Sequence, residues 1–195
     1  MNSATTSTTA DRILDIAEEL VQSRGYEAFS YADIADALKI RKASIHYHFP
    51  SKGELTRALA ERYRAAFAAK LGELDRQQPD PTRRLMRYVR LFQDALRQGD
   101  HMCLYGMLAS DSATLPEAVR QEVNRFFAEQ EAWLTRLLNE GRQAGELRFE
   151  GKPENAAAAL LAGLEGAMLV ARSRKDVAYF AGVALRLAGA LTSEG

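Results

Sequence analysis

The hydrophobic residues of the first fifty positions follow a helical period that sharp turns interrupt. In the first segment four of them fall at helical spacing: Ile13, Ala17, Leu20 and Val21. This spacing predicts a helix over residues 11–24, with Thr9 as its N-cap and Gly25 ending it in a left-handed conformation.

Two short helices are expected next, separated by a tight turn. Ser30 and Asp33 form the pattern of a capping box, which predicts the start of the second helix. The chain must turn at residues 39–42, and a third helix is expected over residues 43–49 before Pro50 stops it. Three helices of these lengths with such a turn predict a helix-turn-helix unit.

The remainder of the chain reads as longer helices. Ser51 and Glu54 form a second capping box, which starts an amphipathic helix over residues 52–74. The segment 77–81 contains two prolines and is the clearest break, and residues 114–117 again have the form of a capped start. Beyond the break, five helices are expected, over residues 82–98, 102–110, 116–144, 154–173 and 176–192.

No alternating run is long enough to predict a strand, so the expected fold is all-α. We expect a flexible tail over residues 1–10, a helix-turn-helix domain over 11–55, a connecting helix over 52–74 and a second helical domain over 75–195. The single cysteine excludes an internal disulfide and fits a reducing compartment. The first nine residues have neither a basic start nor an apolar stretch, so no signal peptide is predicted and the expected location is cytoplasmic.

The formal net charge is zero, but the charges of the N-terminal part are unevenly placed. Residues 11–36 hold seven acidic and two basic residues, whereas residues 39–64 hold seven basic and two acidic ones. A basic strip confined to one short region suits a surface that contacts phosphates, although a solvated helix face would give the same pattern.

The third helix has the composition of a DNA-recognition helix. On a helical wheel Ile45 and Phe49 point to the core, and Tyr47 lies on the opposite face with Ala43 and Ser44 beside it. Such a face can offer hydrogen bonds to base edges in a major groove. The predicted surface is completed by His46 on the flank of the helix and by the cations Arg41, Lys42 and Lys52.

At this point residues 11–64 resemble the DNA-binding domain of the TetR family of regulators. The resemblance is carried by residues 13–17, Gly25-Tyr26, Phe29-Ser30, Asp33-Ile34-Ala35 and the run from Ser44 to Lys52. It implies a homodimer that binds a palindromic operator in double-stranded DNA, usually as a repressor, with a C-terminal helical domain for ligand binding and dimerisation. It also implies contacts to DNA from Lys42, Ala43, Ser44, His46, Tyr47 and Lys52, and places Ser30 and Tyr31 near phosphate.

Three positions depart from the family pattern. Lys39 stands where the family usually has glycine, and a left-handed lysine there would cost about 1 kcal/mol. Arg41 replaces a common capping serine or threonine, which adds charge and removes a cap, and His46 replaces a frequent tyrosine. None of these changes affects the predicted core.

The resemblance also implies an effector cavity in the C-terminal half. Its candidate lining residues are Tyr88, Phe92, Cys103, Met107, Trp133 and Met168, although such residues also fill cores. The segment from Cys103 to Ala109 is similar to a subgroup that senses electrophiles or oxidants, but a lone cysteine in an apolar helix is more often a small buried hydrophobe. The effector remains unidentified at this stage.

Residues 156–171 and 177–192 each contain a single charge, so helices there must be buried on most sides. Pairing with a second copy would supply that cover. A membrane hairpin is the alternative, but each run falls short of the ~20 residues that a span requires.

Other function classes find little support. His46 and His48 are roughly 200° apart on a helix and cannot share a metal ion. No Glu-x-x-His pair, His-Glu-x-x-His motif or glycine-rich phosphate loop is present, so neither an enzyme nor a cofactor is predicted. A helical adaptor that has lost DNA affinity is the remaining alternative, which the retained Ser44, Tyr47 and Lys52 disfavour.

Overall fold

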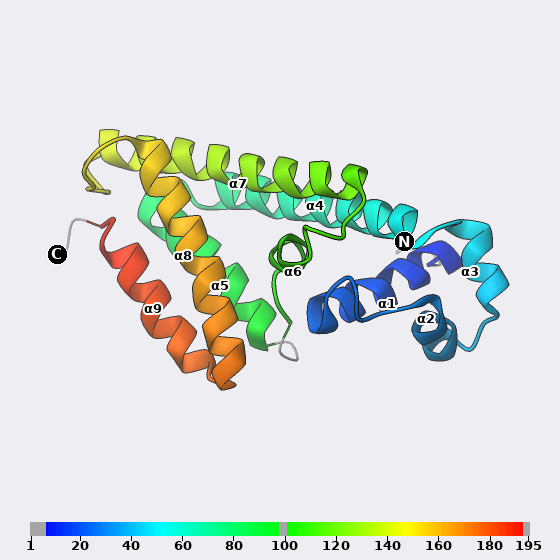
Figure 1. The fold of residues 1–195 in the computed structure, drawn as a ribbon. Helices are drawn as coiled ribbons and strands as arrows, with labels where there is room; N and C mark the ends of the chain where they lie inside the picture. Colours follow the sequence, from blue (N-terminus) through cyan, green and yellow to red (C-terminus); the bar gives the residue numbers. More distant parts are fainter. Residues whose placement is uncertain (1–6, 98–100, 193–195) are drawn as a thin grey trace, which may run out of the picture. The chain divides into compact units, whose positions relative to one another are not determined.

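The computed structural model describes residues 7–97 and 101–192, and over these residues it contains nine helices and no strand (Figure 1). They are α1 (Thr9–Arg24), α2 (Tyr31–Leu38), α3 (Lys42–His48), α4 (Lys52–Gln77), α5 (Pro81–Arg97), α6 (Leu104–Ser110), α7 (Glu117–Gln143), α8 (Pro153–Arg174) and α9 (Val177–Gly189). The all-α prediction is confirmed. Residues 1–6 of the expected tail and residue 98 of the expected fifth helix lie outside the described residues.

The N-cap of α1 is Thr8, so the prediction of Thr9 was wrong by one position. Thr8 accepts a hydrogen bond from the Asp11 amide (3.1 Å) while the Asp11 carboxylate accepts one from the Thr8 amide (3.0 Å). This reciprocal pair needs a spacing of three residues, which Thr8 has and Thr9 lacks. Gly25 ends the helix with a φ of 87° but a ψ of 174°, so its φ is positive while its conformation lies outside the left-handed helical region.

Most of the remaining helix ends lie within two residues of the expected positions, but α9 ends at Gly189, three residues before the expected end at 192. The Ser51–Glu54 capping box precedes α4, which continues to Gln77, three residues beyond the expected end. The capped start expected at 114–117 is absent, because the Thr114 hydroxyl donates to the Asp111 carbonyl (3.0 Å) and accepts nothing from α7. Gly145, with a φ of 75°, follows α7, which ends at Gln143, one residue before the expected end at 144.

The chain divides into two compact units, which are described separately. The first comprises Met1–Tyr63 and Leu104–Val123, and the second comprises Arg64–Cys103 and Asn124–Gly195. The long helices α4 and α7 therefore contribute one part to each unit. In the first unit the core around α1, α2 and α3 is built on fully buried isoleucine and leucine side chains: Ile13, Ile34, Ile45, Leu55 and Leu59.

In the second unit, α5, α8 and α9 pack against one another, and aromatic side chains fill the interior. Tyr88 stacks on Trp133 with their ring centroids 5.2 Å apart, and Phe67 meets Phe126 edge-on at 5.4 Å. Because aromatic side chains bury large apolar areas, these contacts dominate the packing of this unit.

Of the helices in the described residues, α8 is the one whose length and hydropathy would suffice to cross a membrane. It has 22 residues and so extends beyond the sixteen-residue run seen in the sequence. Leu160, Leu164 and Met168 on its inward face are buried, which is the pattern of a core helix.

Candidate nucleic-acid interface

The start of α2 is held by hydrogen bonds within four residues. The Asp33 carboxylate accepts from both the amide (2.8 Å) and the hydroxyl (2.7 Å) of Ser30, and the Ser30 hydroxyl accepts from the Ala32 amide (3.2 Å). The bonds from Ser30 lower the pKa of Asp33. The capping box predicted from the sequence is confirmed, and it leaves the Ser30 side chain exposed at the surface.

The turn between α2 and α3 keeps the left-handed geometry despite the missing glycine. Lys39 has φ 55° and ψ 44°, and its amide bonds back to the Ala35 carbonyl. Arg41 takes the N-cap position of α3 in an extended conformation and makes no side-chain capping bond. The turn is therefore unchanged, with Lys39 in the strained left-handed conformation, whereas α3 lacks a side-chain cap as expected from Arg41.

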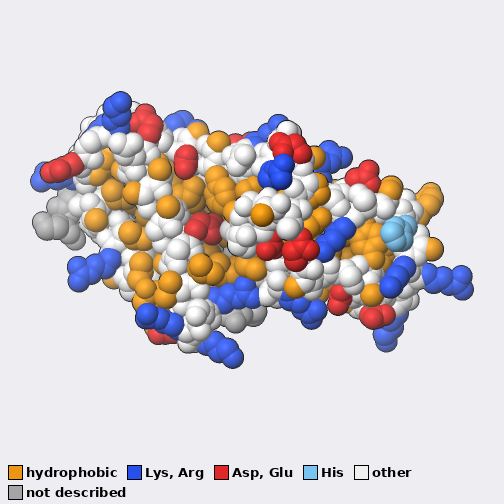
Figure 2. Space-filling view, viewed as in Figure 1, with side chains coloured by type: hydrophobic (Ala, Val, Ile, Leu, Met, Phe, Trp, Pro, Cys, Tyr) orange, Lys and Arg blue, Asp and Glu red, His pale blue; other side chains and the backbone are white. Residues whose placement is uncertain are grey.

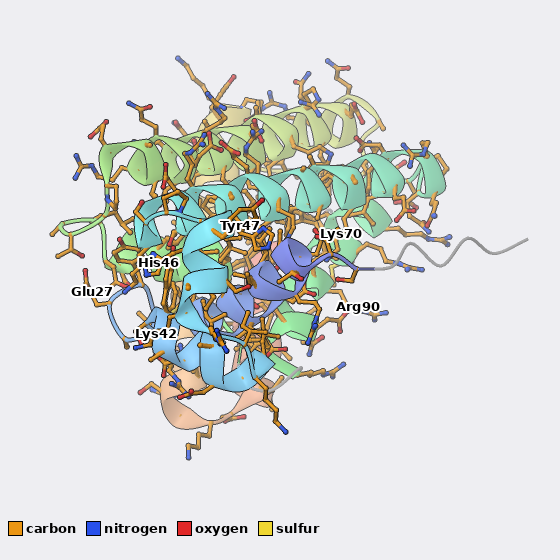
Figure 3. The ribbon with its side chains drawn as sticks, turned by 90° about the vertical axis from the view of Figure 1, so that its right-hand side faces the viewer. Glu27, Lys42, His46, Tyr47, Lys70 and Arg90 are labelled. Atoms are coloured by element: carbon orange, nitrogen blue, oxygen red, sulfur yellow. The ribbon has the colours of Figure 1, made fainter. Side chains whose placement is uncertain are left out.

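Helix α3 is anchored by one face and exposes the other. Ile45 is completely buried, and Phe49, which was expected beside it in the core, is half-buried. On the opposite face the Tyr47 side chain is 84% exposed (Figure 3). The phenol of Tyr47 is therefore accessible to a partner from solvent.

The other predicted contact residues of this region divide by exposure. Four are exposed: Arg41, Lys42, Ala43 and His46. Ser44 is half-buried, and its amide bonds to the Arg41 carbonyl (2.9 Å). Lys42 and His46 lie on the same end of the first unit as Tyr47 in Figure 3.

Tyr31 lies mainly inside the first unit. Its hydroxyl donates to the Phe49 carbonyl (2.7 Å), and its ring lies 4.7 Å from the His46 ring. Burial raises the pKa of Tyr31 to about 12. Its hydroxyl hydrogen is therefore occupied in joining α2 to the residue that follows α3, where it helps to hold α3 in place.

A hollow of about 390 Å³ opens between these elements. Five of the nine predicted DNA-contacting residues line it: Ser30, Tyr31, Lys42, His46 and Lys52. The two lysines bring positive charge from the start of α3 and the start of α4. An anion such as a phosphate would meet imidazole and ammonium donors at this position.

The Lys52 ammonium is held over two aromatic rings. Its Nζ lies 4.5 Å from the ring centroids of both Tyr26 and Phe29. Burial lowers the pKa of Lys52, while Glu27 and Asp111 oppose that shift. The contact of the two rings with Lys52 is long-range, so no local pattern in the sequence could have revealed it.

Asp111 ties the segment after α6 to the start of this aromatic clamp. Its carboxylate accepts a hydrogen bond from the Tyr26 amide (2.7 Å). A Cβ at Gly25 would lie 2.8 Å from the same Asp111 oxygen, so this close approach requires glycine. The contact joins residues 85 positions apart and was not expected from the sequence.

The basic strip is smaller in the structure than in the sequence. Arg62 pairs with Asp15 (2.7 Å) and Glu18 (2.9 Å) on α1, so it stabilises the fold. The Arg57 and Arg64 guanidinium groups also have carboxylate partners, at 2.9 Å and 3.0 Å. The cations that remain for a partner are Lys39, Arg41, Lys42 and Lys52.

The predicted effector residues are mostly buried in the second unit. Tyr88 and Met168 have no exposed surface, and Trp133 donates its indole N–H to Asp75 (3.0 Å). Phe92 meets Tyr88 edge-on at 5.3 Å. Met107 belongs to the first unit and is half-buried there, whereas the other five candidate residues belong to the second unit.

Cys103 is buried, and Glu165 on α8 is the acidic group beside it. Both oxygens of Glu165 are shut off from solvent, and neither has a partner with full hydrogen-bond geometry. Burial raises the pKa of Glu165 to about 7, and the Cys103 thiol partly opposes that shift. The sequence marked Glu165 only as the single charge in an apolar run, so its buried position was missed.

Within the described part of the chain, no three histidine, cysteine, aspartate or glutamate side chains gather as a metal site would require. The Nδ1 of His46 lies 3.3 Å from the Pro50 carbonyl. The centroid of the His48 ring lies 5.2 Å from that of Tyr47 and 6.5 Å from that of Phe49. Both rings are thus engaged in local contacts of α3.

Comparisons with known proteins agree with this geometry. Residues 13–59 match the family described as bacterial regulatory proteins, tetR family, and residues 81–185 match the tetracyclin repressor-like C-terminal domain. A TetR-family regulator from Agrobacterium tumefaciens is 37% identical with a TM-score of 0.92, covering 94% of this chain and 97% of that one.

Two curated relatives are similar over most of their length. The transcriptional regulator AcuR of Cereibacter sphaeroides is 28% identical over 79% of this chain and 72% of its own. The HTH-type transcriptional repressor NemR of Escherichia coli K12 is 27% identical over 88% of each chain. The chain therefore belongs to the TetR family of DNA-binding transcriptional regulators.

Proposed function

We propose that the chain is a cytoplasmic repressor that binds a palindromic operator as a homodimer and leaves it when a small-molecule or reactive effector binds. The observation that carries this proposal is the face of α3, where Tyr47 is 84% exposed beside the free cations Arg41 and Lys42. A phenol and two cations on a helix anchored by Ile45 suit a major groove and its phosphates.

The contacts divide by chemistry. Tyr47, Ser44 and Ala43 would face base edges, because they are short or flat and share the outer side of α3. Arg41, Lys42 and Lys52 would contact phosphates, and the clamp of Tyr26 and Phe29 would fix the Lys52 ammonium in advance. Ser30 lies at the rim of the same hollow, and His46 would contribute there through its ring.

Dimerisation is supported by the apolar surface of α8 and α9. Leu169 is 61% exposed, and a Cβ at Gly166 or Gly182 would meet no atom within 4 Å. Figure 2 shows hydrophobic side chains spread over the face formed by these two helices. A second copy would cover this surface, and two-fold symmetry matches the symmetry of a palindromic operator.

The effector would bind within the second unit near Tyr88, Phe92, Cys103, Trp133 and Met168. The repressor named NemR supports repression as the mode of control. Because coupling is reciprocal, an effector that weakens operator binding must itself bind more weakly to the operator complex. We propose no catalytic activity for this chain.

The decisive experiment is the selection of bound duplexes from a random pool, followed by titration of the selected site. We expect an inverted repeat, bound by two chains, with half-sites one helical turn or a multiple of it apart. Half of that repeat should bind far more weakly. Failure to enrich any sequence, with no salt-dependent binding to duplex DNA, would favour the helical adaptor instead.

A further inference from the structure

A groove of about 500 Å³ lies in the second unit between α5 and α9. This volume is in the range of small-molecule sites. Its floor is apolar and consists of Met86 and Val89 from α5 with Phe180, Ala184 and Leu185 from α9. Met86 and Leu185 are 38% and 63% exposed, so the apolar surface is accessible in the isolated chain.

One wall of the groove is a stripe of three arginines. Arg83, Arg87 and Arg90 follow one another at intervals of four and three residues, which places them on one side of α5. All three are exposed, and Figure 3 shows Arg90 projecting outward from the helix. Arg83 has Asp80 at 3.6 Å, whereas Arg87 and Arg90 have no carboxylate at ion-pair distance within the described residues.

The lining contains no acidic residue, so its charge is uncompensated. Neighbouring Arg84 offers a contrast on the same helix, since it is buried and pairs with Asp75 and Glu140. Arg84 serves the fold, whereas Arg87 and Arg90 are left to solvent or a ligand. A second copy of the same patch would add like charge, so the groove is not self-complementary.

We propose that this α5–α9 groove binds a soluble amphiphile with an anionic phosphate or carboxylate head and an alkyl tail. Arg87 and Arg90 would bind the head through charge-assisted hydrogen bonds, and the floor of Met86, Val89 and Leu185 would cover the tail. The site differs from both the α3 face and the buried cluster around Tyr88. It therefore goes beyond the proposed function and does not require operator release.

Isothermal titration with octyl phosphate, kept below its aggregation concentration, tests the proposal on the full chain. We expect saturable binding that strengthens about fourfold for each methylene that enters the groove, from butyl to hexyl to octyl phosphate. Inorganic phosphate should bind much more weakly because it lacks the tail. Octylammonium should not compete, and equal affinity for octylammonium would overturn the assignment of the arginines.

Variants separate this site from general surface charge. Arg90→Gln and Arg87→Gln should each weaken octyl phosphate binding about tenfold, the value of a hydrogen bond to a charged group. Arg136→Gln, which changes an exposed arginine of α7 outside the groove, should leave it unchanged. Equal binding by all three variants, after circular dichroism confirms that each is folded, would overturn the proposal.

Two further measurements identify other occupants. Binding to vesicles of anionic lipid without any binding of octyl phosphate would assign the groove to a membrane surface and overturn the soluble ligand. If Arg87→Gln or Arg90→Gln changed the oligomeric state without loss of octyl phosphate binding, the groove would be an interface with a second copy of the chain. That result would also overturn the proposed ligand. Operator binding, measured in parallel, tests only the proposed function.

Discussion

The two units of this regulator place their chemistry in opposite environments. In the first unit most of the candidate DNA-binding side chains lie on the surface, and a small buried core beneath α3 holds them. In the second unit Tyr88, Cys103 and Glu165 are enclosed by packed helices. Substitution of an exposed side chain in the first unit can thus change binding without loss of stability. Substitution of one of the buried groups in the second unit also changes the packing of the core.

The largest effect is expected where the first unit loses the anchor beneath its surface. Ile45→Ala removes a fully buried side chain and should cost about 2–5 kcal/mol in the free energy of unfolding. Operator affinity should fall with it, because α3 loses its attachment to the core. Urea unfolding and fluorescence anisotropy on the selected operator measure both effects, and unchanged stability would contradict the described packing.

In the second unit, the buried Glu165 should make the free energy of unfolding depend on pH. The pKa of Glu165 is raised to about 7 in the folded chain, so the folded state holds this proton more tightly than the unfolded state. Stability should therefore fall as pH rises from about 4.5 to 7 and then level off, by about 3 kcal/mol in total. Below that window both states are protonated and the penalty disappears.

Glu165→Gln isolates this contribution. The variant should unfold like the wild type at pH 4.5 and be more stable at pH 8, by up to the same ~3 kcal/mol. Burial raises the pKa of the neighbouring Tyr88 well above its ordinary value, so Tyr88 leaves this window unaffected. A constant difference between the two proteins at both pH values would show that the carboxyl group is not buried as described.

Tyr47→Ala provides the contrast in the first unit. Since Tyr47 is 84% exposed, its removal should leave the melting temperature unchanged within error. Operator affinity should fall by about 1–3 kcal/mol, the value of one good contact to a base. A loss of stability without a loss of affinity would reverse the roles assigned to the two faces of α3.

The sequence predicted those features that depend on neighbouring residues. The capping boxes at Ser30 and Ser51, the break before Pro81 and the outward position of Tyr47 all follow from local hydrogen bonding or helical period. The N-cap of α1 was misplaced although the sequence distinguishes the two threonines, because only Thr8 stands three residues before Asp11, the spacing of a capping box.

Features that depend on distant residues could not be predicted. The Lys52 clamp, the Asp111 bond to the Tyr26 amide and the pairing of Arg62 with α1 join residues far apart in the chain. The burial of Glu165 is of the same kind, because one charge in an apolar run is compatible with a solvent-facing or an interior position. These contacts decide which charges serve the fold and which remain for a partner.

The smallest effect concerns the two lysines in left-handed conformation, one in each unit. Lys39 (φ 55°) and Lys175 (φ 52°) both follow a helix. Replacing either with glycine relieves strain of about 1–2 kcal/mol but increases the entropy of the unfolded chain, so a net gain below about 1 kcal/mol is expected. Thermal melts of Lys39→Gly and Lys175→Gly measure this gain, and a marked loss of stability in either would contradict the left-handed assignment.

The salt dependence of operator binding tests the central claim most directly. Each phosphate contact contributes about 0.9 to the slope of log Kobs against log salt concentration, and a dimer presents two copies each of Lys42 and Lys52, four lysines in all. The double variant Lys42→Ala, Lys52→Ala should therefore bind with a slope shallower by roughly 3.6, whereas Lys70→Ala on the distal part of α4 should keep the wild-type slope. An unchanged slope in the double variant would contradict the claim that these lysines and α3 form the DNA-binding surface.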